Sequence, residues 1–77
     1  MLETQKWIAD WLMCSEEELP PENTPLREIE GWDSLRHLGL VLGLERELNE
    51  KLSAERIRGI VTLGDVAGIL REKFADA

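Results

Sequence analysis

The stretch from Ser34 to about Lys51 constrains the fold more than any other part of the sequence, because its apolar side chains form two stripes on different faces of one predicted helix. The first stripe contains Leu40, Val41, Leu44 and Leu48, and the second contains Leu35, Leu38 and Leu42. The first stripe is expected to face a core. An exposed second stripe is typical of a partner surface, and the alternative is a core that wraps further around the helix.

A five-residue segment, Gly31-Trp32-Asp33-Ser34-Leu35, leads into this helix. Asp is a preferred N-cap residue, so we predict that Asp33 caps the helix and that Ser34 is its first residue. The first backbone N–H groups of a helix have no partner inside it, and the helix dipole favours negative charge at this end. A phosphodiester on the Ser34 hydroxyl would lie in that favourable field.

The region before this segment predicts one helix and a long loop. Residues 4–13 form an amphipathic helix, in which we interpret Trp7 and Trp11 as core side chains rather than as a ligand-stacking platform. From Cys14 to Gly31 the periodicity disappears, and prolines prevent a continuous helix. Three apolar side chains are expected to hold this loop in an ordered conformation, those of Leu19, Leu26 and Ile29.

Two further helices are predicted in the last third of the chain. Ser53 is expected to cap a short helix, Ala54–Arg58, which ends at Gly59. Thr62 and Asp65 have the spacing of a capping box and open a longer helix. The residues expected to complete the core are Ile57, Ile60, Val61, Leu63, Val66, Ala67, Leu70 and Phe74.

The predicted fold is therefore all-α. We expect a helical bundle of three longer helices and one short helix, in a single domain spanning residues 1–77, with a long loop between the first and second helices. A chain of this length can bury one modest core, and a deep active site assembled from several loops is not expected. We interpret the chain as a monomeric, non-catalytic protein on which other enzymes act.

The composition narrows the partners that we expect. Sixteen acidic residues against nine basic residues give a formal net charge of −7. This charge would repel nucleic acid and attract basic protein surfaces, although it also serves solubility. No run of about 18 apolar residues occurs, so no membrane span is expected. Because the chain starts at Met1 without a basic and then apolar leader, we interpret it as a free-standing cytoplasmic protein.

Cysteine and histidine, which most often act as catalytic groups and metal ligands, are scarce in this sequence. Cys14 and His37 are the one cysteine and the one histidine, so neither an internal disulfide nor a zinc site is expected. A nucleophilic serine needs a base, usually a histidine, but His37 falls on the core side of the predicted helix. No catalytic residue is therefore assigned. From the residues alone, Ser34 is an ordinary first-turn serine or a site of modification such as phosphorylation.

The chain resembles the acyl carrier protein family, in which a serine carries phosphopantetheine. The resemblance rests on Gly31, Asp33, Ser34, Leu35, Leu38, Leu40, Leu44 and Glu45, and on the segment 62–66. It covers nearly the whole chain. It implies that a phosphopantetheinyl transferase moves 4′-phosphopantetheine from coenzyme A to Ser34. It also implies that acyl- or aminoacyl-loading enzymes and downstream biosynthetic enzymes use the thiol of this arm, which holds their cargo as a thioester.

The resemblance also implies roles for the residues around the serine. Asp33 matches the acid that caps the helix and contacts the transferase. The surface that partners grip is matched by Leu35, Leu38 and Leu42. The other expected recognition residues are Trp32, Arg36 and Glu45.

Two departures from the family pattern bear on the pathway. Carriers of fatty acid synthesis tend to have acids where this chain has Arg36 and Gly39, and a small residue is common where it has Trp32. These departures favour a specialised polyketide, peptide, lipid-modifying or aminoacyl pathway over housekeeping fatty acid synthesis. The alternative function is a small acidic interaction module in which Ser34 stays unmodified.

Overall fold

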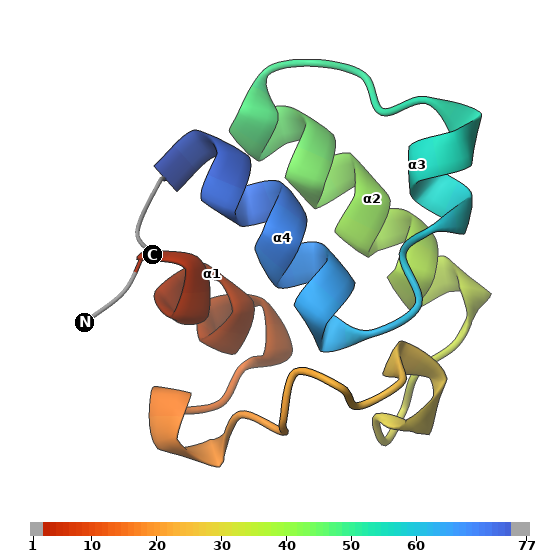
Figure 1. Ribbon diagram of the computed structural model, residues 1–77. Coiled ribbons are helices and arrows are strands. Elements are labelled where there is room, and N and C mark those ends of the chain that lie inside the picture. Colours follow the sequence, from red (N-terminus) through yellow and green to blue (C-terminus); the bar gives the residue numbers. More distant parts are fainter. Residues whose placement is uncertain (1–2, 75–77) are drawn as a thin grey trace.

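The computed structural model describes residues 3–74, and it confirms the predicted all-α fold. Three longer helices, α1 (Glu3–Leu12), α2 (Ser34–Leu48) and α4 (Leu63–Phe74), and one short helix, α3 (Ala54–Arg58), follow in chain order (Figure 1). The loop between α1 and α2 contains two single-turn 3-10 helices, Glu16–Glu18 and Leu26–Glu28. No strand occurs within the described range, and none of its helices is long and apolar enough to cross a membrane.

The bounds of α3 and the start of α4 agree with the predictions, but α2 ends three residues earlier than predicted. Asn49 adopts a left-handed conformation, with φ at 56°, and its backbone N–H donates to the carbonyl oxygens of Glu45 and Arg46. Asn tolerates this conformation better than most residues, and the turn satisfies carbonyls that would otherwise lack partners. The first helix begins at Glu3, one residue before the prediction, and ends at Leu12, one residue before the predicted end, because Met13 is left-handed in the same way.

Helix α4 lies between α1 and α2 and contacts both of them (Figure 1). The buried core joins the inner face of each long helix to the loops, through Ile8, Leu26, Leu40, Val41, Leu44, Leu52, Ile60, Leu63, Val66, Ala67, Ile69 and Leu70. Trp7 and Trp11 pack against this core, as predicted, and so do Ile57 and Phe74. The expectation for Val61 is wrong: its side chain is exposed.

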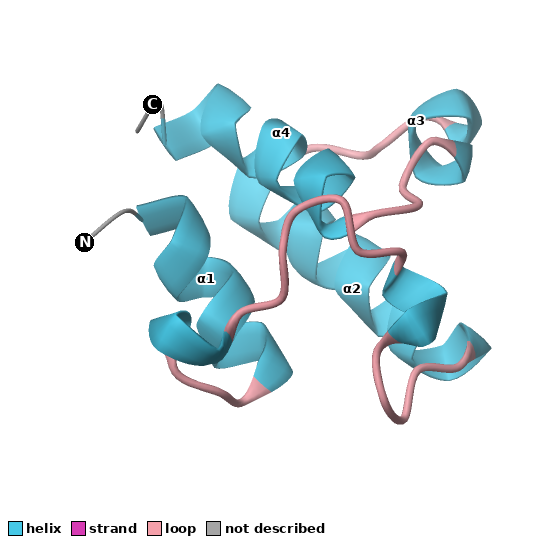
Figure 2. Cartoon of the chain, turned by 60° about the horizontal axis from the view of Figure 1, so that its bottom comes forward, coloured by secondary structure: helices cyan, strands magenta, loops and turns pink. Residues whose placement is uncertain are grey.

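The loop between α1 and α2 is ordered as predicted, and backbone hydrogen bonds attach it to the segment before α4. Its path crosses the end of the bundle (Figure 2). The N–H of Leu26 donates to the carbonyl of Val61 at 2.8 Å, and the N–H of Gly64 donates to the carbonyl of Glu22 at 2.7 Å. A Cβ atom on Gly64 would lie 3.2 Å from that Glu22 oxygen, so the close approach favours glycine. These bonds fix the loop that leads into α2.

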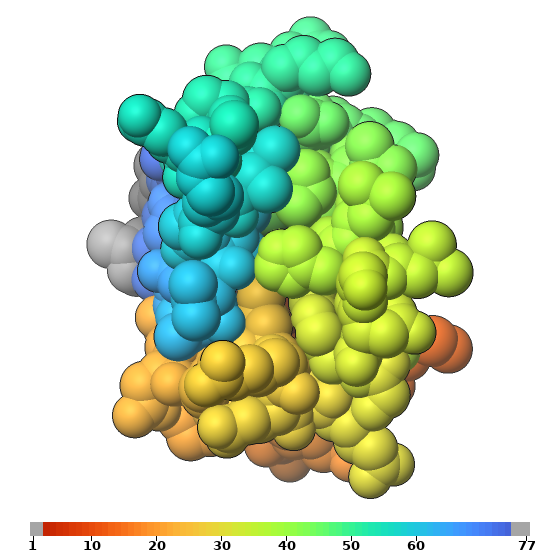
Figure 3. All heavy atoms as spheres, turned by 90° about the vertical axis from the view of Figure 1, so that its right-hand side faces the viewer, coloured from red at the N-terminus to blue at the C-terminus, as the bar shows by residue number. Residues whose placement is uncertain are grey.

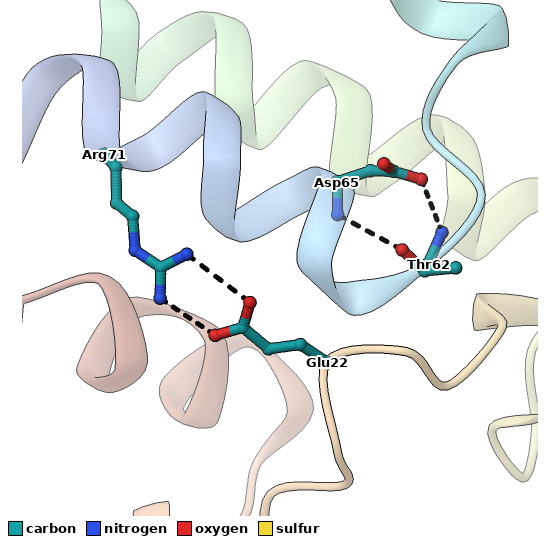
Figure 4. A network of polar contacts seen from close by, with 4 residues as sticks. All are labelled: Glu22, Thr62, Asp65 and Arg71. Carbon is teal, nitrogen blue, oxygen red and sulfur yellow. Dashed lines mark hydrogen bonds and ion pairs between the residues drawn. The ribbon is translucent and has the colours of Figure 1, made fainter. Parts of the chain in front are cut away.

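A capping box starts α4, as the spacing of Thr62 and Asp65 predicts (Figure 4). The N–H of Asp65 donates to the Thr62 hydroxyl at 3.2 Å, and the N–H groups of Thr62 and Val61 donate to one Asp65 carboxylate oxygen at 2.9 Å. These bonds to Thr62 and Val61 hold the pKa of Asp65 below its ordinary value of 3.8. Nearby, Arg71 of α4 binds the Glu22 carboxylate at 2.8 Å and lowers the pKa of that acid too.

Replacing Asp65 with alanine is expected to lower the free energy of unfolding at neutral pH by about 1 kcal/mol. The native state binds a proton on Asp65 less readily than the unfolded state, because its pKa is lowered on folding. The contribution of the carboxylate is therefore complete above the ordinary value of 3.8 and is lost as the pH falls through the lowered pKa. Urea unfolding of both proteins between neutral pH and pH 3 checks this, with the exposed acid Asp10 replaced in the control. A difference that grows toward low pH would contradict the prediction.

Candidate functional site

Ser34 is the first residue of α2, and its side chain is exposed. Asp33 caps the helix as predicted: its backbone is extended, and its Oδ1 accepts a hydrogen bond from the N–H of Arg36 at 2.8 Å. The cap satisfies one of the free N–H groups of the first turn and leaves the hydroxyl of Ser34 outside the helix. This hydroxyl forms no hydrogen bond with any residue that the structure describes.

A tight turn holds the serine segment at the end of the loop. The N–H of Trp32 donates to the carbonyl of Ile29 at 3.0 Å, and between them Gly31 has φ of 81°. This left-handed value is typical of the third residue in a type II turn, where glycine is preferred. A Cβ atom at Gly31 would meet no neighbour within 4 Å, so the backbone conformation, and not lack of space, favours glycine here.

The single histidine of the chain, His37, forms no hydrogen bond with Ser34 and is not positioned as its base. The half-buried ring of His37 packs edge-on against the Trp32 ring, with 5.8 Å between centroids. Because Trp32 itself packs against the core, this contact agrees with the prediction that His37 falls on the core side of the helix. Within residues 3–74, no group of three or more His, Cys, Asp or Glu side chains is arranged to hold a metal ion.

The two apolar stripes of α2 have opposite environments, as predicted. In the first stripe the exposed fraction is 2% for Leu40 and 0% for Leu44. In the second it is 76% for Leu35, 54% for Leu38 and 50% for Leu42. The start of α2 lies on an open face beside α3 and the end of the loop (Figure 3). The core does not wrap around to the second stripe, so these three side chains are free for a partner.

Arg36 and Trp32, which were expected to contact partners, belong to an aromatic cluster with Trp11. The rings of Trp11 and Trp32 lie 5.4 Å apart at an angle of 55°. The Arg36 guanidinium lies over both rings, 5.1 Å from the centre of Trp11 and 5.8 Å from that of Trp32. Such contacts between a cation and an aromatic face are favourable. The place of Trp11 in this cluster was not predicted, because no local sequence pattern joins residues of α1 to the start of α2.

Glu45, the last of the expected recognition residues, has a structural contact. Its Oε2 accepts a hydrogen bond from the N–H of Leu52 at 2.9 Å, and its side chain is half-buried. Glu45 therefore attaches the loop between α2 and α3 to α2. Its second oxygen has no such bond within the described residues.

Comparison with known proteins shows the family to which the chain belongs. A family model described as a phosphopantetheine attachment site matches residues 5–70. The chain belongs to this family. It is also similar to the acyl carrier proteins of three Clostridium perfringens strains, SM101, ATCC 13124 and 13, each 37% identical over 65 residues that cover 84% of both chains. No solved structure matches the chain significantly.

Membership of this family identifies the chain as a carrier protein with covalently attached 4′-phosphopantetheine. Carriers of this kind hold reactants and are not themselves catalysts. The start of α2 fits such a group, because an exposed hydroxyl stands at a helix N-terminus, where the dipole and the free N–H groups favour a phosphodiester.

Proposed function

We propose that the arm is attached to the Ser34 hydroxyl and that the chain carries acyl or aminoacyl groups as thioesters between partner enzymes. The observation that carries this proposal is the exposed, capped position of Ser34 at the start of α2. The thiol of the arm supplies the nucleophilic sulfur and the thioester linkage. Cys14, which is half-buried after the end of α1, is then not needed for the chemistry.

The stripe formed by Leu35, Leu38 and Leu42 is proposed as the surface on which partner enzymes dock. The phosphopantetheinyl transferase must reach the Ser34 hydroxyl, and the exposed leucines extend from the next residue along the same helix. Each partner must bind and then release the carrier, so a small apolar contact is suitable. Asp33 is the acid beside the serine, and its second carboxylate oxygen is open to the transferase.

A specialised biosynthetic pathway fits the charge on this surface better than housekeeping fatty acid synthesis. Arg36 and Gly39 occupy positions in the first part of α2 where acidic residues would meet a basic partner, and Glu45 and Glu47 come only later in the helix. Both of these glutamates also hold contacts inside the fold, with Leu52 and Trp7. We further propose that this carrier works in the cytoplasm.

The test is the intact mass of the purified chain after incubation with coenzyme A and a broad-specificity phosphopantetheinyl transferase. We expect one phosphopantetheinyl increment, and peptide mapping is expected to locate it on Ser34. An unchanged mass, with a circular dichroism spectrum typical of folded helices, would contradict the attachment. It would favour the small acidic interaction module, with the exposed leucine stripe as its binding site.

A further inference from the structure

The interior of the bundle has almost no free space next to the start of α2. The core leaves a cavity of about 10 Å³, close to the room that one water molecule needs. All three tryptophans of the chain line it, together with Ile8, Leu12, Leu26, Leu40, Leu63 and Val66. A well-packed core of this kind accepts extra methylene groups only if its side chains move.

Trp32 connects this cavity with the attachment residue along the chain, because it lines the cavity and is only two residues before Ser34. Its ring packs on Trp11 and on His37. The Arg36 guanidinium lies over the rings of both Trp32 and Trp11. Entry of an alkyl chain beside Ser34 would have to separate these contacts.

A wide hollow on the surface is lined by charged as well as apolar side chains. It has a volume of about 700 Å³ and lies between α1 and α2. Four of its lining side chains are charged: Asp10, Arg46, Glu47 and Lys73. An alkyl chain placed there would displace water from charged groups, which is unfavourable.

We infer that Trp32, Trp11 and Arg36 prevent the acyl group on the arm from entering the core of the bundle, so that this group stays in solvent. This inference rests on the proposed attachment at Ser34. Each methylene group of a long alkyl chain is unfavourable when it stays in water, whereas a short or polar group carries little of this cost. The cargo class that fits this carrier is therefore a short or polar acyl group, such as an aminoacyl or hydroxyacyl group, and not a long fatty acyl chain.

The test compares the wild-type chain carrying acetyl-phosphopantetheine with the same chain carrying octanoyl-phosphopantetheine. A broad-specificity phosphopantetheinyl transferase transfers each arm in one step from the acyl-coenzyme A to the Ser34 hydroxyl and releases adenosine 3′,5′-bisphosphate. Mass spectrometry first establishes that both are loaded, which separates a failure of the attachment from a failure of this inference. We expect the two forms to melt within about 2 °C of each other, whereas burial of the longer chain would raise the melting temperature by more than about 10 °C. All three tryptophans line the cavity, so their fluorescence emission would change if the alkyl chain entered it. We expect the same emission from the acetyl and octanoyl forms. A stabilised octanoyl form with shifted emission would overturn the inference.

Trp32→Ala tests which residue closes the cavity. Removing the indole opens space, so the octanoyl form of this variant is expected to melt at least about 5 °C above its own acetyl form. Phe74→Ala is the matched control, because Phe74 packs against the core but does not line the cavity, and chain length should not affect its melting. If Trp32→Ala is not loaded, Trp11→Ala takes its place. Equal melting of the two forms in a loaded variant would contradict the closing role of the cluster.

Discussion

Replacing Ser34 with alanine is expected to abolish attachment of the arm and to leave the fold and the stability unchanged. The hydroxyl is exposed and bonds to no described residue, so its loss removes no contact from the folded chain. Alanine is also a favourable residue within a helix. After incubation with coenzyme A and the transferase, the mass of the variant is expected to stay at that of the unmodified chain. The rate of attachment is expected to fall by more than about 100-fold, because no other hydroxyl of the described chain has the position of Ser34.

Ser53→Ala is a control with the opposite profile. Ser53 caps α3, and its hydroxyl oxygen accepts a hydrogen bond from the N–H of Arg56 at 3.2 Å. Its loss is expected to reduce the free energy of unfolding by about 0.5–2 kcal/mol without affecting the arm. Replacing Ser34 is thus expected to change attachment of the arm but not stability, whereas replacing Ser53 is expected to change stability but not attachment. A Ser34→Ala chain that still gains the phosphopantetheinyl mass would show that the attachment residue is another one.

The local features of this fold were predictable from the sequence because each depends on residues close together in the chain. The caps at Asp33, Ser53 and Thr62 follow from side chains that reach their own helix start. The exposed stripe of α2 follows from periodicity, which places its three leucines on a different face from the residues of the core.

The features that the sequence did not predict depend on contacts between distant segments. Val61 is exposed because its backbone carbonyl accepts the loop hydrogen bond from Leu26, and its side chain is directed away from the core. The position of Arg36 over Trp11 depends on how α1 approaches the start of α2. The early end of α2 depends on the left-handed Asn49, a conformation that Asn tolerates but that the periodicity of the helix does not reveal.

Replacing Leu38 with glutamate is expected to reduce the kcat/KM of the transferase for this carrier by about 10- to 100-fold, which corresponds to about 1.4–2.7 kcal/mol. Leu38 is 54% exposed, one turn after Ser34, so a charge there meets water in the free carrier and an apolar surface in the complex. The effect is expected mainly in KM, because the serine and its cap are unchanged. The melting temperature should move by less than about 4 °C, as for most surface substitutions.

The matched control is Leu44→Glu, which makes the same chemical change on the opposite stripe of the same helix. Leu44 is fully buried, so its replacement places an unpaired charge in the core, at a free-energy cost comparable with the whole stability of a small domain. This variant is expected to be unfolded by circular dichroism. If Leu38→Glu unfolds in the same way, the second stripe is part of the core. If it stays folded and is modified at the wild-type rate, partners do not dock on this stripe, and the exposed leucines need another explanation.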